Sequence, residues 1–526
     1  MSLAEPARAA EERTPATAEP EAIPPPNRTM VTAALLLAMA VTALEQTVVS
    51  PAMPSIIGAL KGLDIYPWVF SAYLLAATVT TPVYGKLADV WGRRRLLLFG
   101  LIVFSVGSIL SGQATSMPML IAMRVVQGLG AGAVGPIVLT MLGDLFTLKE
   151  RAVVQSLFSA VWGVSSLAGP ALGGYLTDHA SWRWVFYVTV PFAAIAMAIL
   201  AIFVREEHRP RVAKPIDVAG AILLASGSTL LLLAVLQGSG ATAIRVGVLL
   251  AVATAILVAF VSRERRAADP ILPLDLVLQG PIAASIVGSF AVGVLLFGID
   301  TYIPLYVQGV KGGTATEAGW TMTPMFVAWA ISVFVAVWVV LKFGFRTTAT
   351  YGGILITFGV TCLAAGAHWP RVSGPLFVGG MIVIGVGMGP TSLSFILSTQ
   401  NAVAWGRRGV ATAAVTFFRT MGGALGVGFL GATLGFGFAG RLVAAGAGGI
   451  DVVAALRPET HGALSPAELA LVQTSLGATL RDVFLQMIAV GVSTIIAARY
   501  LSPGRAPAPP TESGGAAPSA LAAVLE

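Results

Sequence analysis

Residues 85–95 read Gly85-Lys86-Leu87-Ala88-Asp89-Val90-Trp91-Gly92-Arg93-Arg94-Arg95. This stretch gathers a cluster of charges into a short turn between two apolar runs, in a 526-residue chain of which only 11% of the residues are charged. Such a cluster is stable at the polar edge of a membrane, where the charged side chains stay hydrated while the flanking runs enter lipid. The stretch therefore predicts a turn between two membrane-spanning helices.

The composition indicates a membrane protein independently of this stretch. Hydrophobic residues make up 56% of the chain, and its mean hydropathy is +0.84, far above that of a soluble domain. A helix that crosses the bilayer core needs about 20 apolar residues. Runs of that length recur along the chain, so we expect fourteen spans, at 30–51, 66–88, 96–113, 117–142, 152–177, 182–204, 216–237, 245–262, 281–307, 317–341, 347–366, 375–399, 408–438 and 481–501.

The distribution of Lys and Arg predicts the orientation of these spans. With the N-terminus in the cytoplasm, 22 of the 32 basic residues fall in cytoplasmic segments and eight in external ones, in agreement with the positive-inside rule. An even number of spans returns the C-terminus to the cytoplasmic side. This asymmetry also accounts for the net charge of +7, so nucleic acid is not expected as a partner.

The turn at 85–95 resembles the signature loop between helices 2 and 3 of the major facilitator superfamily, a large class of secondary transporters. Its glycines, its acid and its arginines stand at the family's spacing. The grouping of the spans as six, two and six resembles the fourteen-helix branch of the drug:proton antiporters. The resemblance implies an all-α integral membrane protein in which two six-helix lobes rock about a central cavity, with two extra helices beside them.

The expected domain boundaries follow the charged and proline-rich connections. They are a cytoplasmic tail at 1–28, an N-terminal lobe at 29–204, a linker with two extra spans at 205–265, a C-terminal lobe at 266–502 with an external loop at 439–480, and a second cytoplasmic tail at 503–526. Both tails are expected to be disordered. Within the external loop, Ser465, Pro466 and Glu468 form a capping-box pattern. The last helix is therefore expected to start near Pro466 and to project beyond the membrane.

Gating is assigned to the turn at 85–95. Asp89 lies at a helix end, where it could pair with the N-terminus of a helix in the opposite lobe, and Asp144 is a natural partner for an arginine. Making and breaking such contacts would bias the balance between inward-facing and outward-facing states. The expected gating residues are Gly85, Asp89, Gly92, Arg93, Arg94 and Asp144.

Glu45 and Arg124 are candidates for proton coupling, because an ionisable group inside the bilayer is costly and needs a partner or a function. At a rise of about 1.5 Å per residue, both lie in the outer half of the membrane, so an ion pair between them is sterically plausible. Protonation of Glu45 would neutralise it and loosen the pair. The surrounding sequences, 44–54 and 124–132, resemble the first-helix and fourth-helix motifs of the family, whose arginine is assigned to proton coupling. The alternative is a static ion pair that fixes the helix register.

The fifth span contains Gly169, Pro170, Gly173 and Gly174 in a Gly-Pro-x-x-Gly-Gly pattern. A proline inside a transmembrane helix predicts a bend, and the glycines predict a smooth face for close helix packing. The pattern resembles the motif that marks antiporters within the superfamily, which favours export over import. A glycine-rich kink without a mechanistic role is the alternative.

Four polar residues are candidates for the substrate cavity: Asp300, Gln400, Asn401 and Arg419. Asp300, in the ninth span, could attract a cationic substrate or take a second proton, or it could be exposed to water near the helix end. Arg419 lies near mid-depth in the thirteenth span, where packing and anion binding fit equally well. Gln400 and Asn401 end the twelfth span, and a structural role is the simpler explanation for both.

Together these features predict a proton-coupled antiporter of the cytoplasmic (inner) membrane that exports amphipathic, lipophilic drugs and dyes. A dedicated exporter of one endogenous metabolite, lipid or antibiotic would use the same machinery and is the alternative. The sequence shows neither a catalytic His/Asp/Glu cluster nor a phosphate-binding glycine loop, so we expect no enzyme activity, no cofactor and no use of ATP. Its four histidines are too scattered for a metal site.

Overall fold

The computed structural model describes residues 27–503, apart from 147, 205–216, 236–242, 268–269, 271, 273, 370–371, 404–406 and 447–464. All regular elements of this described part are helices. The tails expected at 1–28 and 503–526 fall almost wholly outside the described residues, as does the segment 447–464 of the expected external loop.

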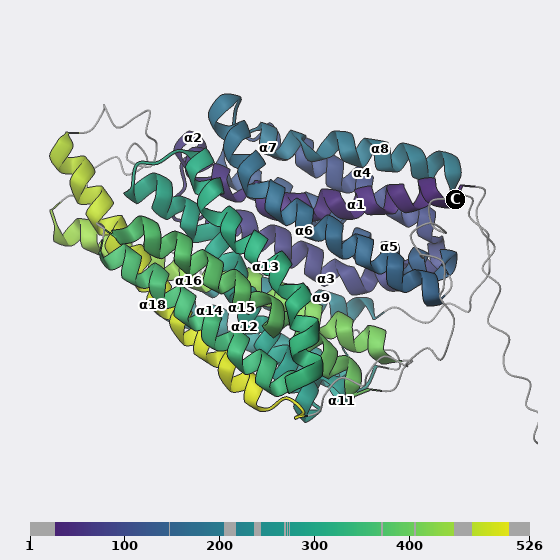
Figure 1. The fold of residues 1–526 in the computed structure, drawn as a ribbon. Helices are drawn as coiled ribbons and strands as arrows, with labels where there is room; N and C mark the ends of the chain where they lie inside the picture. Colours follow the sequence, from purple (N-terminus) through teal and green to yellow (C-terminus); the bar gives the residue numbers. More distant parts are fainter. Residues whose placement is uncertain are drawn as a thin grey trace, which may run out of the picture.

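The first part of the chain forms six long helical segments. They are α1 (Arg28–Val48), continued by η1 (Ser50–Ala52) and α2 (Met53–Leu60); α3 (Pro67–Trp91); α4 (Arg93–Gly112); α5 (Met117–Leu145); α6 (Leu148–His179); and α7 (Trp184–Tyr187) followed by α8 (Thr189–Phe203). α1 packs against α6 and α8, while α5 packs against α3 and α4. These helices form the upper, purple-to-blue part of Figure 1.

A hairpin of two helices follows, α9 (Val218–Val235) and α10 (Ala243–Glu264). α9 also contacts α3 and α16, whereas most of α10 is exposed. The chain continues through α11 (Leu274–Val277), α12 (Gly280–Leu305), η2 (Tyr306–Val310), α13 (Ala315–Phe343), α14 (Phe345–His368), α15 (Ser373–Asn401), α16 (Arg408–Ala444) and α18 (Pro466–Arg499). The order and positions of these helices agree with the fourteen expected spans.

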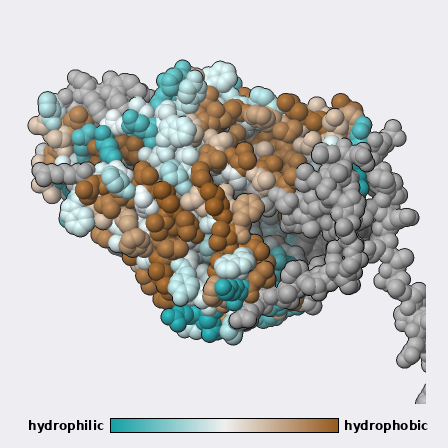
Figure 2. Space-filling model, in the orientation of Figure 1, coloured by the Kyte–Doolittle hydropathy of each residue, from teal (hydrophilic) through white to brown (hydrophobic). Residues whose placement is uncertain are grey.

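The sides of the helices are apolar enough for a bilayer. Among the described residues, eleven helices are long and apolar enough to cross a membrane, and Val218–Ala234 is a shorter apolar helix. On the face shown in Figure 2, hydrophobic residues cover the sides of the bundle and hydrophilic residues gather toward its ends. The apolar side chains on these surfaces are the ones that lipid can solvate.

Two glycine turns mark a structural repeat. Gly92 joins α3 to α4 with a φ of +90°, and Gly344 joins α13 to α14 with a φ of +84°, a backbone conformation that favours glycine. At the start of each following helix an arginine reaches a main-chain carbonyl at the end of a distant helix. Arg94 donates to Leu200 at the end of α8, and Arg346 donates to Leu501 just after α18. In both halves of the chain, an arginine after a glycine turn therefore fixes the end of the last helix by a hydrogen bond to a main-chain carbonyl.

The helices of the first part meet those of the last part along a surface that we call the seam. It consists of η1 with the start of α3 (Tyr66–Ser71) and the end of α6 (Pro170–Asp178) on one side. On the other side are the end of α12 (Asp300–Leu305), η2, the start of α13 (Ala315–Met322) and the middle of α16 (Ala424–Gly431). Hydrogen bonds join the two sets of helices across the seam, among them those of Ser50 with Asp300, Ser71 with Ala424 and Asp178 with Ala315.

The helix expected to begin near Pro466 does so. The Ser465 hydroxyl accepts a hydrogen bond from the Glu468 amide at 3.3 Å, and the Glu468 carboxylate accepts one from the Ser465 amide at 2.8 Å. This is a complete capping box with proline at the first helical turn. α18 then runs without interruption to Arg499.

Candidate functional site

The structure brings Glu45 of α1 and Arg124 of α5 together. Arg124 Nη1 lies 2.5 Å from Glu45 Oε1, and the two side chains are 1% and 0% exposed. Glu45 Oε2 is also buried, and no hydrogen-bond partner for it lies in the described part of the chain. A carboxylate with one oxygen held by an arginine and the other without a donor can accept a proton without breaking a second bond.

Three further groups surround the guanidinium of Arg124. Nη1 donates to Gln127 Oε1 at 2.6 Å and Nε donates to the carbonyl of Val69 at 3.1 Å. The centroid of the Tyr73 ring lies 4.2 Å from the guanidinium carbon of Arg124. This cation–π contact stabilises the buried positive charge. Gln127 donates in turn to Ser108 Oγ at 3.1 Å, so the pair belongs to a network that joins α1, α3, α4 and α5.

The glycines of the fifth span hold α1 in place. A Cβ added to Gly169 would overlap the side chain of Thr47, and one added to Gly173 would overlap the carbonyl oxygen of Val48. Gly174 packs in the same way against Ala315 of α13, and α6 continues through Pro170 as one helix. The motif therefore brings α6 into close contact with the helix that carries Glu45 and, across the seam, with α13.

The expected gating residues lie around the α3–α4 turn. Arg93 donates to the carbonyl of Thr140 at 3.1 Å, and Arg94 donates to the carbonyls of Leu200 at 3.2 Å and Ala201 at 2.6 Å. Gly85 lies in α3 with space for a Cβ. The side chains of Asp89 and Asp144 lie outside what the structure describes, so their pairing stays a prediction.

Asp300 is buried in the seam and is not the water-exposed residue that one alternative expected. Its side chain is 2% exposed, and neither carboxylate oxygen has a hydrogen-bond partner among the described residues. Its main-chain oxygen accepts a hydrogen bond from Ser50 Oγ, from the other side of the seam. The position near a helix end suggested exposure, but the packing of η1 over the end of α12 removes this residue from solvent.

The other cavity candidates lie apart from one another. Gln400 donates to Thr412 Oγ1 at 2.9 Å and so links α15 to α16, while Asn401 is exposed at the end of α15. Arg419 is partly buried at the level of Gly293, because its carbonyl oxygen lies where a Cβ of Gly293 would be. The structure does not bring these residues to Glu45 or Asp300.

Sequence reasoning missed several contacts of the site. Gln127 stands three residues after Arg124, on the same helix face, and that spacing could have identified it. No local signal identifies Tyr73 or Ser108. Asp178, at the end of α6, accepts hydrogen bonds from the amides of Ala315 at 3.2 Å and Thr316 at 2.7 Å, which are orphan donors at the start of α13.

Comparison with known proteins identifies the family of this chain. The model of the Major Facilitator Superfamily matches residues 35–427. The multidrug transporter protein MdtP of Bacillus subtilis (strain 168) is 35% identical over 411 residues, which cover 77% of this chain and 75% of that protein. Multidrug resistance protein 3 of the same organism is 34% identical over 403 residues, which cover 76% of this chain and 78% of that protein.

Solved structures agree with this match at the level of the fold. The crystal structure of a bacterial homologue of the human lysosomal transporter Spinster, in an inward-facing and occupied conformation, superposes with a TM-score of 0.66. The alignment covers 90% of this chain and 96% of that one, at 16% sequence identity. At that identity the likeness concerns the arrangement of the helices and does not extend to a cargo.

Proposed function

Because the chain belongs to the Major Facilitator Superfamily and is a multi-pass membrane transporter of small molecules, we propose that it is a proton-coupled antiporter that exports amphipathic, lipophilic compounds. The relatives named as multidrug transporters support export and the class of cargo. The close packing of the Gly-Pro-x-x-Gly-Gly motif of α6 against α1 also supports the antiporter assignment. The family's members are transporters, and we propose no enzyme activity for this chain.

The observation that carries the proposal is the buried ion pair of Glu45 and Arg124. In the outward-facing state a proton from outside neutralises Glu45, and Arg124 is then held by Gln127, Val69 and Tyr73 alone. The loosened pair favours the return to the inward-facing state, where Glu45 releases the proton to the cytoplasm. In the inward-facing state cargo binds while Glu45 is ionised and paired with Arg124, and the protein then turns to the outward-facing state with the cargo bound.

The proposed setting is the inner membrane, with both termini in the cytoplasm, as the distribution of Lys and Arg indicates. The seam then closes the external side, and the structure corresponds to an inward-facing state. Residues 29–204 and 266–502 are proposed as the two moving lobes, with 205–265 beside them. Gly85, Asp89, Gly92, Arg93, Arg94 and Asp144 are proposed as the cytoplasmic gate, and Asp300, Gln400, Asn401 and Arg419 as groups near the cargo path.

Dye transport in inverted membrane vesicles tests the proposal. With an acid lumen, wild-type vesicles are expected to accumulate ethidium, and an uncoupler is expected to stop the uptake. Glu45→Gln, which cannot release a proton, is expected to lose the coupled uptake, whereas Asp64→Asn, a change at an exposed acid in the turn between α2 and α3, is expected to keep it. Uptake by Glu45→Gln at the wild-type rate and with the same response to the uncoupler would contradict the role of Glu45.

A wild-type protein that moves no dye, although the pH gradient is present, would contradict the multidrug proposal. The alternative, an exporter dedicated to one metabolite, lipid or antibiotic, would then explain the fold and the buried pair. Proton release from such a protein on addition of candidate compounds identifies the cargo without a dye.

A further inference from the structure

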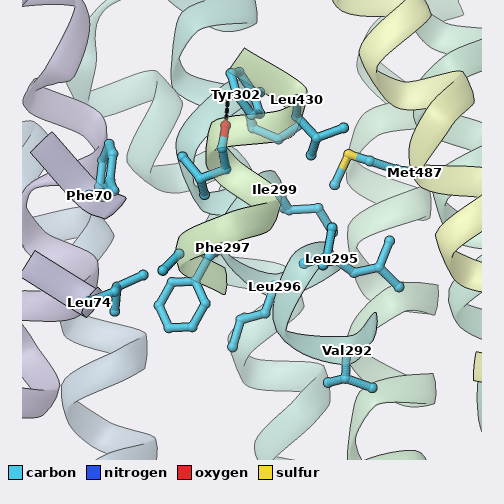
Figure 3. Packing of buried hydrophobic residues seen from close by; sticks show 14 of the residues in the cluster. Phe70, Leu74, Val292, Leu295, Leu296, Phe297, Ile299, Tyr302, Leu430 and Met487 are labelled. Carbon is cyan, nitrogen blue, oxygen red and sulfur yellow. Dashed lines mark hydrogen bonds between the residues drawn. The ribbon is translucent and has the colours of Figure 1, made fainter. Parts of the chain in front are cut away.

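Asp300 is proposed to lie near the cargo path, but this buried acid takes no part in the exchange of the proton at Glu45. Both of its carboxylate oxygens are enclosed by protein without a hydrogen-bond donor among the described residues. The neighbouring residues of α12 are apolar or pack among apolar side chains. Figure 3 shows Phe297, Ile299 and Tyr302 of α12 among residues of α3, α16 and α18, such as Leu430. An ionised carboxylate in such a place costs several kcal/mol, so the closed seam requires a neutral Asp300.

No cation compensates this carboxylate within the described residues. η1, α2 and α15 contain no charged side chain. Near the start of α3 the polar groups are the hydroxyls of Tyr66 and Tyr73, and the charged residues of α3, Lys86 and Asp89, stand near its other end. On α16, Arg419 lies level with Gly293, seven residues or about 10 Å along α12 from Asp300. Other charged groups of the packed elements are engaged elsewhere: Glu317 and Glu468 cap their own helices, Lys342 lies over Trp338, Asp275 pairs with Arg407, and Asp482 pairs with Arg441 and Arg481. Arg408 and Arg499 stand at the ends of α16 and α18.

The seam itself closes around Asp300. Ser50 Oγ donates to the main-chain oxygen of Asp300, and two turns later Gln308 Nε2 donates to the carbonyl of Pro51 at 2.8 Å. Both bonds join η1, which directly follows the helix of Glu45, to the end of α12 and η2. If the seam opens, these bonds break and Asp300 meets the water of that side of the membrane.

We propose that Asp300 is a second proton-binding site, filled from the external water, and that its protonation is required for the seam to close. With the seam open, the hydrated carboxylate takes a proton from hydronium and leaves water. The neutral acid is then buried as the two sets of helices meet. On reopening, the acid returns the proton to the same external water. This proton is not carried across the membrane, so Asp300 sets the pH at which the external side closes without adding to the protons exchanged per cargo.

The inference uses the orientation given under the proposed function, but its test does not depend on transport. Lys61 and Lys311 are exposed, at the ends of α2 and η2 on opposite sides of the seam. Nitroxide labels on Lys61→Cys and Lys311→Cys, in a Cys362→Ser background, report the distance across the seam by pulsed electron resonance in lipid nanodiscs. For the wild type we expect the short distance at about pH 5 and a growing population of long distances toward about pH 8. In Glu45→Gln, where Asp300 is the acid linked to closing, the ratio of long to short distances should rise by at most about tenfold per pH unit, the limit for one linked proton.

Asp300→Asn, which is neutral at every pH, is expected to hold the short distance to higher pH than the wild type does and, when combined with Glu45→Gln, at every pH tested. Asp300→Glu restores an ionisable group and is expected to regain the pH response, which guards against a variant that merely folds badly. Glu45→Gln is expected to favour the short distance more than the wild type does, because the pair with Arg124 is neutralised, but to keep a pH response, because the buried acid remains. An unchanged response in Asp300→Asn, or a wild type without any response, overturns the inference. A response that is lost only in Glu45→Gln overturns it as well and assigns the pH dependence to the pair with Arg124. Loss of dye transport in Glu45→Gln tests the proposed function. It neither supports nor contradicts a role of Asp300 in closing the seam.

Discussion

Gly173 of α6 packs directly against the main chain of Val48 on α1, three residues after Glu45. The carbonyl oxygen of Val48 occupies the space that a Cβ at position 173 would need. Because this oxygen belongs to the main chain and cannot move without shifting α1 itself, a Cβ at position 173 would push the two helices apart. The position of the coupling helix thus depends on a glycine of α6.

The first prediction is that Gly173→Ala separates α1 from α6. We expect a loss of about 1–3 kcal/mol of stability, as for other overpacked cores, together with impaired dye transport. The matched control is Gly163→Ala in the same helix, where a Cβ meets nothing within 4 Å. Melting temperatures and vesicle transport of the two variants decide the matter. Equal behaviour of Gly173→Ala and Gly163→Ala would show that the close contact is not required.

Asp178 supplies a second prediction, because its carboxylate caps α13 from another helix. Asp178→Ala leaves the amides of Ala315 and Thr316 without this acceptor, at a cost of about 1 kcal/mol, typical of a lost helix cap. That energy corresponds to about a fivefold shift from closed to open seam. The label pair at positions 61 and 311 measures the shift. Thr177→Ala, which removes a hydrogen bond within α6 only, should leave the distances unchanged. A closed population in Asp178→Ala equal to that of the wild type contradicts the prediction.

The sequence predicted the helices well for a physical reason. A span that crosses the bilayer core needs about 20 apolar residues, so each span can be recognised from its own local sequence. It also predicted that Glu45 and Arg124 would lie together, because the cost of an isolated charge in the bilayer leaves few partners for each. The spacing of the glycines around Pro170 likewise predicted a close helix contact. It did not identify the contact partners, Thr47, Val48 and Ala315.

The contacts across the seam could not be predicted in this way. Asp178 and Ala315 are 137 positions apart, and Ser50 and Asp300 are 250 apart. Nothing near Asp178 or Ser50 in the sequence indicates which helix the chain will bring to them. The burial of Asp300 has the same origin, since its carboxylate is enclosed by elements from both halves of the chain and not by its own neighbours.

A third prediction concerns the arginine that ties down the last helix of the second half. Arg346 Nε donates to the carbonyl of Leu501 at 3.0 Å. Arg346→Gln should cost about 1 kcal/mol locally, the usual net value of one hydrogen bond. We expect faster amide hydrogen exchange at 497–501, with little change elsewhere. Arg266→Gln, at an exposed position in the α10–α11 connection, serves as the control. Exchange that rises equally in both variants would contradict a specific role of Arg346.

A fourth prediction uses the exposed ion pair of Asp275 and Arg407, whose atoms lie 2.6 Å apart. The hydrogen bond from Arg407 holds the pKa of Asp275 below its ordinary value. A pKa that is lowered by folding adds stability above the ordinary value of about 4, and this stability is lost as the pH falls below it. Because both side chains are about half exposed or more, Arg407→Gln should lower the melting temperature at pH 7 by less than about 2 °C. The difference between the two proteins should shrink as the pH falls from about 4 through the lowered pKa of Asp275, and a difference that does not shrink would contradict the assignment.

The last prediction separates positioning from proton transfer in the buried network. Gln127→Leu removes the amide oxygen that accepts from Arg124 Nη1 at 2.6 Å, so a buried cationic donor loses one of its acceptors. The expected cost is about 1–3 kcal/mol of stability. Since the guanidinium is then free to move away from Glu45, dye transport should fall by about tenfold, yet the uncoupler should still stop it, because Glu45 remains. Ser105→Ala, a buried change on α4 that affects only a bond to Leu101 of the same helix, is the matched control. Uptake by Gln127→Leu that no longer responds to the uncoupler would make Gln127 itself part of the proton coupling. Unchanged uptake would show that the hydrogen bond from Arg124 to Gln127 is not needed for the pair of Glu45 and Arg124 to function.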